Sequence, residues 1–155
     1  MTDPIDPIVH ATAVSMIDAR RVMAIATVRP DGWPHNTIVG YANDALTIYF
    51  LIFKSSQKFR NIVNNDRVAI AIGEQPADIH LAEAVYAAGH AAEIIDPQER
   101  EHAWRLLAKR HPNLAGRGMP DQSVTAIMGA TCEHVTVLDY SKGLGHTDAL
   151  ELPDR

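Results

Sequence analysis

The stretch FLIFKSSQKFRNIVNND, residues 50–66, joins an apolar run to an amphipathic helical pattern. Two serines and two lysines stand where the run ends and the helical pattern begins. A helix N-terminus leaves backbone amides unpaired and carries partial positive charge, so it attracts anions. A lysine in the first turn opposes the helix dipole unless an anion is bound there. The stretch therefore suggests a phosphate pocket. Its candidate residues are Lys54, Ser55, Ser56, Lys58 and Arg60.

The same residues also have an ordinary structural interpretation. Ser55 or Ser56 can be a helix N-cap, and Lys58 can be a solvated surface lysine. The stretch alone leaves both interpretations open.

The composition describes one domain over residues 1–155, with a core at about 8–146 and loose ends at 1–7 and 148–155. The chain has 155 residues, of which 46% are apolar, enough to bury a sizeable core. No apolar run is long enough for a membrane span. The first residues are acidic and lack the apolar segment of a signal peptide, so a cytoplasmic location is expected.

The charge and the cysteine content exclude other classes of protein. The net charge is −5 and the basic residues are scattered, whereas nucleic-acid binding needs a basic face. A single cysteine, Cys132, rules out an intrachain disulfide framework and agrees with a reducing compartment. Cys132 is either a small buried residue, the commoner case, or a reactive thiol.

Periodicity and turn signals predict about six strands and three helices. The strand at 46–53 is apolar on both faces and should be central. Alanine-rich strands suggest that something packs closely against them. Short antiparallel strands joined by hairpins favour a closed or partly closed barrel. Helices are expected over 8–21, 56–64 and 96–112, and strands over 22–28, 34–42, 46–53, 67–73, 84–95 and 123–140, the last as one strand or a bulged pair.

The order of these segments resembles the pyridoxamine 5'-phosphate oxidase-like family of FMN-binding split barrels. The family pattern L-A-T-x-x-x-D-G-x-P-H is matched from Ala26 to His35, and S-x-K-x-x-N-I-x-x-N-x-x-V is matched from Ser55 to Val68. The resemblance covers about residues 10–145. It implies a mainly β (α+β) fold, a six-stranded antiparallel Greek-key split β-barrel with flanking helices. It also implies a two-fold homodimer with flavins at the interface.

The resemblance further implies which residues contact FMN. The phosphate would lie at the serine–lysine corner, and the strand at 35–39 resembles the one that runs beside the isoalloxazine ring. The partner chain would supply a second wall from residues 141–146. The candidate cofactor-binding residues are His35, Asn36, Thr37, Ile38, Val39, Phe53, Lys54, Ser55, Ser56, Lys58, Arg60, Lys142 and His146.

An FMN-dependent oxidoreductase with a small-molecule substrate is therefore the expected function. The flavin would carry the hydride or electron chemistry, so no catalytic residue is assigned. The C-terminal arginine motif with which the vitamin B6 oxidase grips pyridoxal phosphate has no match here, so that activity is not expected. The alternatives are a deazaflavin- or haem-binding protein, a flavin-binding module without turnover, and a structural dimer with an empty pocket.

The eight histidines show no paired spacing typical of a zinc site, and no metal is expected. His35 is either a hydrogen-bond donor to a flavin or substrate, or a surface hairpin residue. His90 is expected to be a satisfied interior histidine. His90 and His146 are the candidate axial ligands under the haem alternative.

Overall fold

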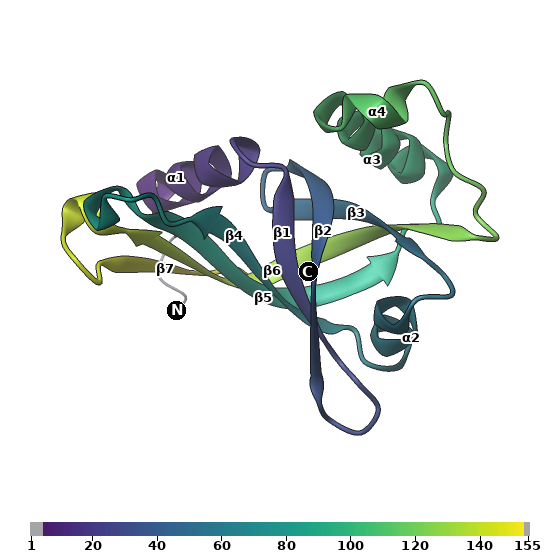
Figure 1. Ribbon diagram of the computed structural model, residues 1–155, viewed down its shortest axis with the longest axis horizontal. Helices are drawn as coiled ribbons and strands as arrows, with labels where there is room; N and C mark the ends of the chain where they lie inside the picture. Colours follow the sequence, from purple (N-terminus) through teal and green to yellow (C-terminus); the bar gives the residue numbers. More distant parts are fainter. Residues whose placement is uncertain (1–4, 154–155) are drawn as a thin grey trace.

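Six antiparallel strands form a closed barrel in this computed structural model, which describes residues 5–153 (Figure 1). The sheet order is β3-β2-β1-β4-β5-β6-β7, and a further pairing of β3 with β6 closes the ring. The predicted six-stranded barrel is thereby confirmed. The strands are β1 Val22–Val28, β2 Pro34–Asp44, β3 Thr47–Phe53, β4 Arg67–Glu74, β5 Glu83–Glu93, β6 Thr125–Asp139 and β7 Thr147–Glu151.

The three predicted helices are present, and each begins at a side-chain cap. Asp6 accepts hydrogen bonds from the Ile8 and Val9 amides, Ser56 from the Phe59 amide, and Asp96 from the Glu99 amide. Such caps pair amides that a helix start would otherwise leave free. The helices are α1 Pro7–Asp18, α2 Gln57–Asn64, α3 Pro97–Arg110 and the short α4 Pro112–Ala115, with 3₁₀ turns η1 Ile79–Leu81 and η2 Tyr140–Lys142.

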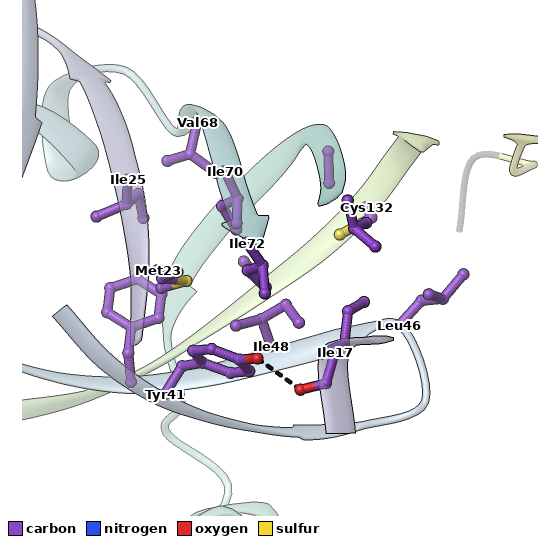
Figure 2. Packing of buried hydrophobic residues seen from close by; sticks show 14 of the residues in the cluster. Ile17, Met23, Ile25, Tyr41, Leu46, Ile48, Val68, Ile70, Ile72 and Cys132 are labelled. Atoms are coloured by element: carbon purple, nitrogen blue, oxygen red, sulfur yellow. Dashed lines mark hydrogen bonds between the residues drawn. The ribbon is translucent and has the colours of Figure 1, made fainter. Parts of the chain in front are cut away.

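The main core fills the barrel (Figure 2), and Ala13, Met16 and Ile17 of α1 pack into it. Alternation along the strands decides which residues enter it, since neighbouring side chains point to opposite faces. On β4, Val68, Ile70 and Ile72 are buried, as predicted from the sequence. The buried Tyr41 hydroxyl donates to the Ile17 carbonyl over 2.5 Å and ties β2 to the end of α1.

A second, smaller core holds α3 against the outside of β2, β3 and β6. Its buried members include Ala103 and Leu107 of α3. Polar contacts fix the end of α3 to β2: Arg110 Nη1 donates to Asn43 Oδ1 over 2.6 Å, and His111 Nε2 lies 2.9 Å from the Tyr41 carbonyl oxygen. The α3–α4 layer thus lies outside the barrel, above β3 in Figure 1.

The barrel is split between β2 and β3. These strands pair only through residues 41–44 and 47–50. Beyond that point, residues 34–40 of β2 stay paired with β1, whereas residues 51–53 of β3 continue along β6. The facing edges of β2 and β3 therefore diverge, and α2 follows directly from the end of β3.

The C-terminal part of the chain differs from the prediction. Residues 148–151 were expected to be a loose end, but they belong to β7, which pairs with His134–Leu138 of β6. The buried Leu150 is the reason, since it packs into the main core. The predicted loop after α3 also contains α4. Residues 1–4 and 154–155, predicted to be loose, lie outside the described residues.

None of the helices formed by residues 5–153 combines the length and the apolar character needed to cross a bilayer.

Among the glycines of the described chain, Gly89 has the least room for a side chain, and it lies where β5 shifts register against β6. A Cβ atom built at Gly89 would lie 1.9 Å from the Thr131 carbonyl oxygen. We expect Gly89→Ala to lower the free energy of unfolding by about 2 kcal/mol or more, because overpacking that moves the backbone typically costs 1–3 kcal/mol. Urea denaturation measures the change.

Gly116→Ala is the matched control. A Cβ atom at Gly116 would meet nothing within 4 Å, and its φ of −84° suits any residue. Equal stability of the two variants would contradict the close approach at Gly89.

Candidate functional site

A cavity of about 500 Å³ opens where β3 ends and α2 begins. Its lining residues come from the end of β3 and the start of β6, from the first turn of α2, and from α3, α4 and the loop that follows. The walls are mostly apolar, but two cations reach them. The lining residues are Leu51, Ile52, Phe53, Ser56, Lys58, Trp104, Leu114, Arg117, Gly118, Pro120 and Thr125.

The first turn of α2 supplies the polar corner of this cavity. The Ser56 side chain accepts from the Phe59 amide over 3.2 Å, and the Arg60 amide bonds back to the Ser56 carbonyl oxygen. This arrangement leaves the Gln57 and Lys58 amides as the usual unpaired donors of a helix start. Three of the predicted residues, Phe53, Ser56 and Lys58, are brought together at the cavity. Ser56 is the helix N-cap, as its structural interpretation held, and it also lines the cavity.

A buried hydrogen-bond chain fixes α2 against β1. Gln57 Nε2 donates to Asn61 Oδ1 over 2.8 Å, and Asn61 Nδ2 donates to Thr27 Oγ1 over 3.0 Å. Asn61 and Thr27 are almost completely buried. Arg60 joins the same chain, because its guanidinium donates to Gln57 Oε1 over 3.0 Å and to the Ser55 carbonyl oxygen over 2.6 Å.

The other two predicted cations of the corner have protein partners. Lys54 Nζ lies 2.9 Å from Glu93 Oε1 and 5.9 Å from the centre of the Phe59 ring. Arg60 is exposed and is held by the turn itself. Ser55 is exposed. None of these three residues lines the cavity, so within the described chain Lys58 is the predicted cation that faces it.

The predicted strand 35–39 lies in β2, across the split from this cavity. His35 and Thr37 pair with the buried Thr27 and Ile25 of β1, which places their side chains on the inner face of the barrel. Asn36 and Ile38 alternate with them and point outward. Thr37 Oγ1 and His35 Nδ1 are buried without a hydrogen-bond partner among residues 5–153. Val39 is partly buried against the core.

Lys142 and His146 lie at the opposite end of the molecule. They flank the turn between η2 and β7, the yellow tip in Figure 1, whereas α2 is near the other end of β6. Both face Asp148: His146 Nε2 lies 3.0 Å and Lys142 Nζ 3.5 Å from its Oδ2 atom. These two partners lower the pKa of Asp148, the His146 hydrogen bond most. Within one chain, neither residue reaches the cavity.

Sequence reasoning missed the wall made by α3 and the loop after α4. Trp104, Leu114 and Arg117 line the cavity, but their approach depends on the tertiary packing of α3. The one local signal was Gly116-Arg117-Gly118, a cation between two glycines in a loop.

Two residues noted in the sequence lie away from the cavity. His90 is not interior: its side chain is 41% exposed, and its ring nitrogens lie 2.8 Å from Asp66 Oδ1 and 2.9 Å from Glu133 Oε1. The hydrogen bond to Asp66 raises the pKa of His90. Cys132 is buried, as the commoner alternative held, and burial raises the pKa of its thiol to about 11.

Comparison with protein families finds a match over most of the chain. The model of the family described as pyridoxamine 5'-phosphate oxidase matches residues 9–138. The chain belongs to this family. The resemblance seen in the motifs is thereby confirmed. None of the curated proteins compared with the chain is similar to it.

Solved structures share the split-barrel fold at low sequence identity. A heme-binding protein from Mycobacterium smegmatis has a TM-score of 0.77 and 18% identity, over 97% of this chain and 60% of that one. General stress protein 26 from Bacillus anthracis has a TM-score of 0.71 and 18% identity, over 93% of this chain and 98% of that one. An FAD-binding protein from Mesorhizobium loti has a TM-score of 0.65 and 21% identity, over 82% of this chain and 91% of that one. This chain therefore spans less than two thirds of the first of these proteins.

The hydrogen-bond chain through Asn61 generates a stability prediction. Asn61→Ala removes the donor to Thr27 and the acceptor for Gln57. We expect the free energy of unfolding to fall by about 2 kcal/mol, because buried polar groups left unpaired cost about 1–3 kcal/mol. Urea denaturation measures it. Asn64→Ala is the control, since Asn64 is exposed on the same helix. If both variants keep wild-type stability, the hydrogen bonds of Asn61 do not hold α2 in place.

Proposed function

We propose that this protein is an FMN-binding flavoprotein that acts as an oxidoreductase on a small molecule. The observation that carries the proposal is the cavity at the start of α2, where apolar walls meet Lys58 and the first turn of a helix. A flavin mononucleotide has the same two characters, an extended ring with apolar faces and a phosphate. The described residues therefore fit this cofactor.

The size of the cavity agrees with this fit. Its volume of about 500 Å³ lies inside the range of roughly 300–1,000 Å³ that is typical of small-molecule sites. Phe53 and Trp104 give it aromatic walls. The adjoining cavity at Gly40 shares Leu51 and Leu114 with it and extends toward β2. The unpaired edge of β2 offers backbone donors and acceptors there, which suits the polar edge of a flavin ring.

Each residue of the site then has a binding task. Lys58 and the amides at the start of α2 bind the phosphate. Ser56 fixes the geometry of that turn. Phe53 and Trp104 exclude water from the ring. FMN, when bound, supplies hydride or electron transfer. The substrate, for which no residue is assigned, would meet the ring at its open side.

The proposal includes a homodimer with the cofactor at its interface. Val22, Ile38 and Tyr86 are 56%, 69% and 47% exposed, although they are apolar or aromatic. They border outer hollows of about 460 and 390 Å³ over the small side chains of β1 and β4. Exposed apolar patches of this kind often mark interfaces. The segment with Lys142 and His146 is the candidate second wall, supplied by the partner subunit.

The dimer is tested by sedimentation velocity. We expect a single species of about twice the chain mass of 17.0 kDa. A single species of monomer mass over micromolar concentrations would contradict the interface.

The cofactor is tested by the absorption spectrum and by titration with FMN. We expect flavin bands in the purified protein, or a melting temperature that rises when FMN is added. A Soret band would point to haem instead, and stabilisation by deazaflavin alone would point to that cofactor. A colourless protein that none of the three stabilises would reject the proposal.

Lys58→Ala tests the phosphate corner. We expect FMN affinity to fall by about tenfold or more, because hydrogen bonds to charged groups contribute about 1.5–3 kcal/mol. Lys109→Ala is the matched control, since Lys109 is exposed in the last turn of α3 and lines no part of the cavity. Unchanged FMN affinity in Lys58→Ala would place the phosphate elsewhere.

A further inference from the structure

A second cation, from another part of the chain, lines the same cavity. Arg117 lies in the connection between α4 and β6, flanked by Gly116 and Gly118. Its backbone is fixed by a turn, because the Arg117 amide donates to the Leu114 carbonyl oxygen over 3.0 Å. Gly118 follows with a φ of +69°, a conformation that favours glycine. The loop thus holds Arg117 at a defined place beside the cavity.

The charge of this cavity is unbalanced. No Asp or Glu is among its lining residues, and none of the ion pairs formed within residues 5–153 includes Lys58 or Arg117. The nearby acids are engaged elsewhere. Glu93 pairs with Lys54, and Asp121 accepts hydrogen bonds from the Ser123 amide and hydroxyl. Two cations that line one cavity, with no carboxylate among its lining residues, favour an anion of more than one charge.

A phosphate monoester meets this requirement, since it carries about −1.5 to −2 charges near neutral pH. Lys58 supplies one compact positive charge. A guanidinium supplies a planar fork of donors that matches phosphate oxygens. The glycine on either side lets the arginine loop approach a ligand closely.

We propose that Arg117 is a second phosphate ligand, which clamps the cofactor phosphate from the α3–α4 side while Lys58 holds it from α2. This inference rests on the proposed function, and it adds a residue outside the segment of β3 and α2 that predicted the site.

The experiment compares FMN with riboflavin, which has the same ring and no phosphate. Dissociation constants for both are measured with the full-length protein by flavin fluorescence. In Arg117→Ala we expect FMN affinity to fall by about tenfold, the size typical of one charge-assisted hydrogen bond, with riboflavin affinity unchanged. Arg117→Lys should recover part of the loss, because it restores the charge without the fork. Arg105→Ala, on the exposed face of α3, should change neither constant.

Three results would overturn the inference. Unchanged FMN affinity in Arg117→Ala would show that the phosphate does not need this residue. An equal loss for FMN and riboflavin would show that the arginine shapes the ring site. Failure of the wild-type protein to bind FMN would reject the proposed function together with the inference, whereas the first two results reject the inference alone.

Discussion

The pairing of β3 with β6 is the constraint on which the rest of the structure depends. It joins Thr47–Phe53 to Thr125–Thr131 and turns an open sheet into a barrel. β3 stays paired with β6 along its whole length but with β2 over only four residue pairs. The split beside β2 therefore begins where β3 continues along β6 alone. The pairing with β6 also directs the end of β3 outward, so that α2 begins at the mouth of a cavity and not inside the core.

The cavity lies between two parts of the molecule that are held in different ways. On the barrel side, α2 is held by the buried hydrogen bond between Asn61 and Thr27. The α3–α4 side rests on a separate small core and on the polar contacts of Arg110 and His111. Charge is distributed in the same way. Lys54 pairs with Glu93 at the end of β5, whereas none of the ion pairs formed within residues 5–153 includes Lys58 or Arg117.

Local sequence signals predicted most of the fold, because they act over a few residues. The capping residues Asp6, Ser56 and Asp96 mark the helix starts. The alternation of Val68, Ile70 and Ile72 predicted the inner face of β4. The predictions that were wrong concern features that depend on residues distant in the sequence. β7 is a short edge strand with one buried side chain, Leu150, and it forms by pairing with β6. The cavity wall with Trp104 and Arg117 depends on how α3 packs back over β3. His90 was predicted to be interior. In the structure it follows the register shift between β5 and β6, and its ring lies beside Asp66 and Glu133.

The position of the α3–α4 layer has a consequence for how such a protein can diversify. This layer contributes one wall of the cavity but no hydrogen-bonded rung of the barrel. Residues 112–123 take no part in the strand pairing, so substitutions, insertions and deletions there are expected to leave the barrel in place. Selection can reshape the ligand site there while the β-framework stays constant. In a fold arranged in this way, the strands can stay the same while the residues that line the cavity change. The similar structures named for heme and for FAD have this fold at 18% and 21% sequence identity to this chain.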